Sequence, residues 1–248
     1  IQGFKISKTA KIKEAGYGNI ALSYLFTFLL YFSLLMIGQM LMQSVIEEKN
    51  NRVVEVLLSS LNSKELMSGK IFGSAITGLL QMIVWLSPII LLMSTTLYIL
   101  PAKFSFDISA GQMIFLLFNF FVGLITFLGL FAAVGSIFES AQEAQSGLMP
   151  IMILIIIPFF IALTMMQNPT NEIAKIASMF PFASIIVMPA KMMLVDVPTW
   201  QFIVAIVVNI LTVIAIFPIA GKIYSVGILR TGKKPKWSEV IKWLKYNY

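Results

Sequence analysis

Two short stretches between long uncharged runs of the sequence carry acidic side chains. The charged residues that matter here are Glu47, Glu48, Arg52 and Glu55 in the first stretch, and Glu139 and Glu143 in the second. Paired carboxylates can serve acid–base catalysis, but nothing near Glu139 and Glu143 supplies a nucleophile, a base or metal ligands. The sequence has no cysteine and no histidine, which excludes thiol catalysis, disulfides and histidine metal sites. We therefore expect no catalytic residue and no metal site, and interpret the charges as contacts with a partner.

The first stretch, residues 47–61, has the spacing of an amphipathic helix. The apolar residues at helical intervals on one arc are Val53, Val54, Leu57, Leu58 and Leu61. The polar residues on the opposite side are Glu48, Arg52, Glu55 and Ser59. Glu48 and Arg52 are four residues apart, which predicts a pair that stiffens the helix by about 0.2–0.5 kcal/mol. Periodicity alone fits a helix that docks on a partner and one that rests on lipid headgroups equally well.

The second stretch, residues 139–146, lies between two long apolar runs. Glu139 and Glu143 are four residues apart, and the spacing predicts that they share a helical face with Gln142 and Ser146. Such an acidic patch fits a second contact with a partner. The alternative is a solvated end of a membrane span.

Uncharged polar side chains interrupt the apolar runs at several positions. The ones that we consider are Ser33, Gln39, Gln81, Asn119 and Asn209. Polar groups are costly in hydrocarbon unless they face protein or water, so these residues are candidates for a transport path. Hydrogen bonding between helices is the more common role of uncharged side chains. No Asp, Glu, Lys or Arg lies in the middle of a run, which gives no support for a proton relay or a charged ion-binding centre.

Membrane-spanning helices must position these residues. Of the 248 residues 58% are hydrophobic and 12% are charged, and the mean hydropathy is +0.90, a composition typical of an integral membrane protein. The uncharged runs are residues 15–46, 71–102, 108–138, 144–171, 176–190 and 197–221. A spanning helix needs about 20 apolar residues, and every run except 176–190 is long enough. We expect an all-α integral membrane protein with about five transmembrane helices.

The short run 176–190 has only 15 residues and contains Pro181 and Pro189. Proline removes a backbone donor and clashes with the preceding turn, which is costly in hydrocarbon. We therefore expect residues 176–196 to form a broken re-entrant hairpin, with a sixth crossing as the alternative. In the run 108–138, three glycines predict close approach of neighbouring helices, and they are Gly123, Gly129 and Gly135.

Basic residues are concentrated after the last run. Seven of the 18 basic residues lie there: Lys222, Arg230, Lys233, Lys234, Lys236, Lys242 and Lys245. A basic flank is typical of the cytoplasmic side, so the net charge of +7 gives no indication of nucleic acid. Residues 222–248 are predicted to form a basic cytoplasmic tail ending in a helix in the inner membrane interface. The apolar side of that helix is Trp237, Val240, Ile241, Leu244 and Tyr248.

Charge counts and the five-span arrangement disagree about the start of the chain. Five spans put residues 47–70 inside with the tail, and place 11 Lys and Arg inside and 7 outside, whereas six spans give 13 and 5. The positive-inside rule is weak for large translocated domains, and the sequence opens without methionine or a signal segment. We therefore expect residues 1–19 to be the tail of an external segment and residues 20–221 to be the transmembrane domain.

Short motifs follow one another in order from about Leu41 to the tail. The first are Glu48-Lys49, Arg52, Glu55-Val56-Leu57-Leu58-Ser59-Ser60, Leu66 and Gly69-Lys70-Ile71. The later ones are Ser140 with Glu143-Ala144-Gln145 ahead of Pro150, Phe180-Pro181-Phe182, Val187-Met188-Pro189, Val197-Pro198 with Trp200, Gly221-Lys222-Ile223-Tyr224 and Gly232-Lys233-Lys234-Pro235. This ordered set resembles the type-2 ABC exporter permeases, especially the bacterial sodium-efflux permease subfamily. One departure is Leu61-Asn62-Ser63-Lys64, where relatives tend to carry a proline or a hydrophobic turn.

The resemblance implies that residues 47–61 form a cytoplasmic coupling helix that docks in a groove of a separate ATPase subunit. The implied coupling residues are Glu47, Glu48, Arg52, Glu55, Leu57, Leu58 and Ser59, with Glu139 and Glu143 at a second contact. It also implies a second permease chain, either identical or different, in a bacterial plasma membrane, and a first span and external domain that are missing here. ATP and Mg are expected on the partner, because the sequence has no G-x-x-x-x-G-K-[ST] motif.

The function that the resemblance implies is ATP-driven export of sodium ions, a drug or an antimicrobial peptide. An alternative is a membrane immunity or binding protein that acts without transport. An intramembrane enzyme is disfavoured, because histidine, cysteine and acidic residues within the runs are all absent.

Overall fold

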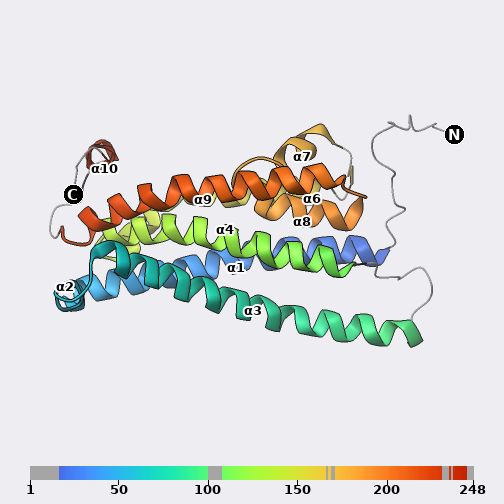
Figure 1. Ribbon diagram of the computed structural model, residues 1–248, viewed down its shortest axis with the longest axis horizontal. Coiled ribbons are helices and arrows are strands. Elements are labelled where there is room, and N and C mark those ends of the chain that lie inside the picture. The colour runs from blue at the N-terminus through green and yellow to red at the C-terminus, as the bar shows by residue number, and fades with distance from the viewer. Residues whose placement is uncertain are drawn as a thin grey trace.

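The computed structural model describes residues 17–99, 108–165, 167–168, 171–230, 235 and 237–244. Within these ranges every regular element is a helix (Figure 1). The helices are α1 Tyr17–Asn50, α2 Val53–Leu58, α3 Ser63–Ile99, α4 Ala110–Ile137, α5 Ala141–Gly147, α6 Met149–Met165, α7 Glu172–Ala177, α8 Ser184–Leu194, α9 Thr199–Gly227 and α10 Trp237–Trp243. The predicted all-α fold is confirmed.

Four of the described helices are long and apolar enough to cross a membrane, namely α1, α3, α4 and α9. Helices α5 and α6 meet at an angle of 59° and supply a fifth candidate if the bent pair is one span. The expectation of about five spans is therefore confirmed, and the chain is a multi-pass membrane protein.

Helix α4 forms the centre of the bundle. It packs against α1, α3 and α9. In the most apolar 18-residue segment of α4, 72% of the residues are buried, compared with 28% for α3 and 17% for α9. Phe120, Phe127 and Phe131 of α4 are fully buried. The outer helices keep apolar side chains exposed, as Ile203 and Ile214 of α9 show. This distribution suits a bundle surrounded by lipid, because the solvent for the outer faces is itself apolar.

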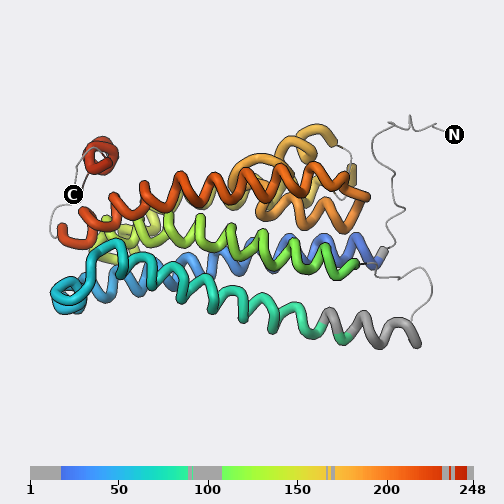
Figure 2. The backbone as a smooth tube through the Cα atoms, in the orientation of Figure 1, coloured from blue at the N-terminus to red at the C-terminus, as the bar shows by residue number. Residues whose placement is uncertain are grey.

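The connections gather at two opposite ends of the bundle (Figures 1 and 2). One end, which we call the α2 end, holds α2, the α4–α5 connection, the last turn of α9 and α10. The other end holds the start of α1 together with α7 and α8. Both charged stretches and the described part of the basic tail therefore share one end, as the five-span arrangement predicts. Of the expected external tail, residues 1–19, only the last three lie within the described residues.

The predicted re-entrant segment consists of two short helices that do not continue one another. Helix α7 ends at Ala177, the chain reverses near Pro181 with Phe182 at φ 65°, and α8 begins at Ser184. All residues of α8 are buried. Its 11 residues correspond to about 16 Å of helix, roughly half of a hydrocarbon core of about 30 Å. The α8 arm is thus buried and too short to span, with Pro189 accommodated within it. Ile176 and Phe180 before it are exposed, so the prediction of a buried hairpin holds only for α8.

Candidate functional site

The first charged stretch is divided between two helices. Residues 47–50 form the last turn of α1, and α2 begins only at Val53. Arg52 separates them with φ 55° and ψ 14°, a left-handed conformation that costs about 1–2 kcal/mol for a residue with a Cβ. The predicted single coupling helix over residues 47–61 is therefore wrong. Glu47 and Glu48 lie on α1, whereas Glu55 lies on α2.

Helix α2 exposes two of its five apolar side chains, Val53 and Val56. Val56 is 71% exposed, and Val53 and Leu61 are also exposed. Leu57 and Leu58 are half-buried, while Val54 is buried. Val53, Val56 and Leu61 together form an exposed apolar surface, because α2 lies beyond the ends of the spans. Such a surface marks a site of protein or membrane contact. Glu55 and Ser59 are exposed beside them.

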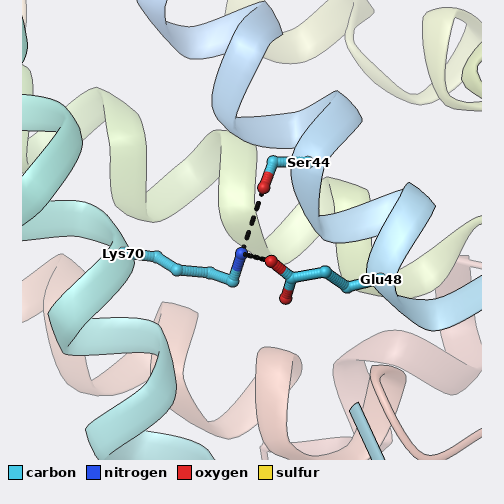
Figure 3. A network of polar contacts seen from close by, with 3 residues as sticks. All are labelled: Ser44, Glu48 and Lys70. Carbon is cyan, nitrogen blue, oxygen red and sulfur yellow. Dashed lines mark hydrogen bonds and ion pairs between the residues drawn. The ribbon is translucent and has the colours of Figure 1, made fainter. Parts of the chain in front are cut away.

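Glu48 pairs with Lys70 of α3. Figure 3 shows the Lys70 ammonium between the Glu48 carboxylate and the hydroxyl of Ser44. The ammonium donates to Glu48 Oε1 and, at 3.1 Å, to Ser44 Oγ. The predicted Glu48–Arg52 pair is therefore wrong, and the carboxylate instead links α1 to α3. This link lies next to the break before α2.

Lys70→Met is expected to lower the free energy of unfolding by about 2 kcal/mol, between the values for exposed and buried ion pairs. The side chains of Lys70 and Glu48 are only 13% and 27% exposed, so the carboxylate would lose its partner in a poorly solvated place. Thermal unfolding in detergent measures the loss, with exposed Lys64→Met as the control. Adding Glu48→Gln should recover part of the loss, and equal losses in Lys70→Met and Lys64→Met would contradict the pairing.

The second charged stretch contacts the end of α1. Asn50 Nδ2 donates a hydrogen bond to the backbone oxygen of Glu139 at 2.7 Å. Ser140 caps α5 by accepting from the backbone N–H of Glu143 at 3.2 Å. Glu139 thus precedes the helix that contains Glu143, so the predicted shared helical face is wrong. The fold nevertheless brings both stretches together at the α2 end.

A pocket of about 460 Å³ lies between α2, the α4–α5 connection and the end of α9. Its lining residues are Lys49, Asn50, Arg52, Val54, Glu55, Glu139, Ile228 and Leu229. The lining combines both signs of charge with apolar side chains. Such a surface can receive a partner side chain of either polarity, and it holds no cluster of acidic ligands suited to a metal among the described residues.

Comparison with known proteins identifies the family of this chain. Residues 2–222 match the ABC-2 family transporter proteins. The chain belongs to this family. It is 29% identical over 241 residues to the uncharacterized protein MJ1024 of Methanocaldococcus jannaschii, a match that covers 96% of this chain and 57% of the relative. It is also 26% identical over 241 residues to the uncharacterized protein YhaP of Bacillus subtilis, with coverages of 95% and 58%.

The ABC-2 chain therefore spans a little more than half the length of these relatives. No solved structure gives a significant match to it. Family membership makes the chain a membrane permease component of an ABC-2 transporter. The names of the two relatives specify no substrate.

In this ABC-2 permease the tail helix α10 is attached to the end of α9. Arg230 lies 3.4 Å from Glu239 Oε2 and 5.6 Å from the centre of the Trp243 ring. Val240 and Trp243 are buried, whereas Ile241 is exposed. The predicted apolar side is thus wrong at Ile241 and omits Trp243. Tyr248, which was predicted to extend that side, lies outside the described residues.

Two of the predicted transport-path residues meet inside the bundle. Asn209 Nδ2 donates to Asn119 Oδ1 at 2.7 Å, and Ser184 Oγ donates to Asn209 Oδ1 at 2.7 Å. Asn119 in turn donates to the backbone oxygens of Ser184 and Ile185. These bonds tie the start of α8 to both α4 and α9. The geometry fits interhelical hydrogen bonding, and a role of Asn119 and Asn209 in transport stays a prediction.

The other predicted transport-path residues do not join this network. Ser33 is buried, and its hydroxyl has no partner among the described residues. Gln39 and Gln81 are half-buried on α1 and α3. The structure therefore brings together only Asn119 and Asn209 of the five candidates.

Two buried lysines were missed from the sequence. Lys191 of α8 is buried and donates to Ser178 Oγ at 3.1 Å and to Gln201 Oε1 at 2.7 Å. Lys49, at the end of α1, is also buried. Lys191 directly follows the run 176–190 and lies inside the predicted re-entrant segment 176–196. A charged residue within that segment was the sequence signal that could have identified it. Lys49 stands in a last helical turn, where a cation can meet unpaired carbonyl groups.

Proposed function

We propose that this ABC-2 permease is the membrane-spanning part of an ATP-driven exporter and that its α2 end receives a separate ATPase subunit. The exposed apolar surface of α2, next to the pocket that Glu139 shares with Arg52 and Glu55, is the observation that carries the proposal. Family membership supports it, because ABC-2 permeases generally pair with ATPase subunits. ATP and Mg would bind to that subunit, and the exposed Glu143 would provide an additional contact.

The attachment of α2 suits it to transmit movement. It is six residues long and is joined to α1 and α3 through short connections. The backbone N–H of Asn62 donates to Glu65 Oε2 at 2.9 Å, which fixes the start of α3. Ser60 N–H bonds back to Leu57 O at 3.1 Å. A short helix held in this way passes on a rigid-body displacement that a loose loop would absorb.

The basic residues at the α2 end support a cytoplasmic position in the plasma membrane. Lys222 lies on α9, Arg230 lies just after it, and Lys242 lies on α10. Lys64 and Lys70 lie near the start of α3. Cytoplasmic flanks of membrane spans carry an excess of Lys and Arg. We further propose that a second permease chain, identical or different, completes the transporter.

Val56→Asp is expected to reduce copurification of the ATPase subunit at least tenfold. Burying a valine contributes roughly 1.5–3 kcal/mol, and an aspartate in its place would have to be desolvated. Ile173→Asp is the matched control, because Ile173 is also an exposed β-branched residue in a six-residue helix, but lies at the opposite end. Glu55→Lys tests the charged side of the same surface. If Val56→Asp retains both the ATPase and ATP-dependent transport, α2 is not the docking helix.

The proposed substrates are sodium ions, a drug or an antimicrobial peptide. Transport into vesicles that contain the complete complex would separate them, with radioactive sodium, a hydrophobic dye and a hydrophobic peptide as the probes. Uptake of one probe that requires ATP supports an exporter of that class. If the protein protects cells against the drug or peptide even when the ATPase subunit is inactivated, that result would instead support a membrane immunity or binding protein.

A further inference from the structure

Three consecutive residues at the end of α1 each reach a different neighbour. Glu48 binds Lys70 of α3. Lys49 Nζ donates to Ser136 O at 2.7 Å and to Gly227 O at 2.8 Å, and these carbonyl groups belong to the last turns of α4 and α9. Asn50 donates to the α4–α5 connection. The residues directly before the break at Arg52 are thus bonded to three other spans and to the second charged stretch.

Lys49 makes the central connection of this group. A helix leaves its last carbonyl groups without partners inside the helix, and its dipole makes that end negative. Ser136 is the penultimate residue of α4, and Gly227 is the last residue of α9. The Lys49 side chain is only 6% exposed, so its ammonium is committed to these two helix ends. A lysine in the last turn of a helix ordinarily hydrogen-bonds to carbonyl groups of its own helix or to water, whereas Lys49 hydrogen-bonds to two other spans.

The close approach of α4 and α9 allows one ammonium to reach both. A Cβ on Gly227 would lie 2.5 Å from Ser136 Oγ and 3.0 Å from the backbone carbon and oxygen of Ser136. The two helix ends therefore meet only because residue 227 is glycine. Since both acceptors are backbone atoms, the bonds fix the helix ends themselves and not merely side-chain rotamers.

We propose that Lys49 is a positioning residue that locks the ends of α4 and α9 to the α1–α2 break, so that a displacement of α2 moves three spans together. The coupling role rests on the proposed function of α2 as the docking helix. The mechanical connection itself does not, because all of its bonds lie within this chain. This separation allows the two ideas to be tested independently.

The connection can be measured in the full chain in lipid nanodiscs. The sequence has no cysteine, so Val56→Cys and Leu229→Cys, at positions that are 71% and 64% exposed, provide two spin-label sites across it. We expect one narrow distance distribution. Lys49→Met should broaden it at least twofold, while Lys64→Met, the same change at an exposed lysine, should leave it unaltered. An unaltered distribution in Lys49→Met overturns the proposal.

A second measurement addresses coupling in the complex with its ATPase. Within the complex that copurifies, Lys49→Met should lower the number of substrate molecules transported per ATP hydrolysed at least tenfold. Asn50→Ala, at an exposed position that does not threaten folding, should give a smaller loss in the same direction. An unchanged ratio in Lys49→Met overturns the coupling role. Failure of the unmodified protein to copurify with any ATPase would refute the proposed function, and the spin-label result would still decide the role of Lys49.

Discussion

Asn209→Leu is expected to release α8 from α9 and to lower the free energy of unfolding by about 2–6 kcal/mol, since each orphaned buried group costs about 1–3 kcal/mol. Leucine has the same number and branching of side-chain heavy atoms but cannot hydrogen bond. The Ser184 hydroxyl would lose the acceptor that it reaches at 2.7 Å, and Asn119 Oδ1 would lose the donor at 2.7 Å. All three side chains are buried, so water cannot easily replace the lost partner.

Thermal unfolding in detergent measures this effect, and Thr212→Val on the same helix is the matched control. Thr212 Oγ1 donates only to Val208 O within α9, so its removal should change stability little. Similar losses in Asn209→Leu and Thr212→Val would contradict the network. A variant Asn209→Leu that unfolds at the normal temperature but loses transport would support the transport-path role predicted from the sequence.

The spans were predictable because length and apolarity decide them. The uncharged runs 108–138 and 197–221 correspond to α4, Ala110–Ile137, and to most of α9, Thr199–Gly227. In lipid the backbone must satisfy its own hydrogen bonds, so a long apolar run has few alternatives to a helix. The broken segment was predictable for the related reason that an uncharged run of 15 residues is too short to cross the hydrocarbon core as a helix.

The details of the candidate site were less predictable, because they depend on packing between distant segments. Helical periodicity continues through residues 47–61, and neither glycine nor proline marks the break at Arg52. Local spacing favoured Arg52 as the partner of Glu48, whereas the fold supplies Lys70, 22 positions away. The hydrogen bonds of Lys49 could not be predicted, because its acceptors are backbone carbonyl groups 87 and 178 positions away. No side-chain pattern can indicate such partners.

Gly135→Ala is expected to lower the free energy of unfolding by about 3 kcal/mol, the upper part of the usual range for overpacking. The three glycines of α4 look equivalent in the sequence, but their surroundings differ. A Cβ at Gly135 would lie 2.9 Å from the backbone oxygen and 3.2 Å from the Cα of Met42, so α1 itself would have to move. At Gly123 the nearest obstacle is a side-chain methyl group of Ile185 at 2.5 Å, which can yield more easily.

Gly129→Ala supplies the matched control within the same helix. Its Cβ would meet the Cβ of Ala220 at 3.6 Å, which is an ordinary contact. Alanine is favoured over glycine in a helix by about 0.5–1 kcal/mol, so this variant should be as stable as the parent or slightly more so. Unfolding temperatures measured side by side in detergent test the contrast. Equal tolerance of both substitutions would mean that α1 and α4 are not in backbone contact near Gly135, and the attachment of Lys49 to the end of α4, one residue further along, would lose its structural basis.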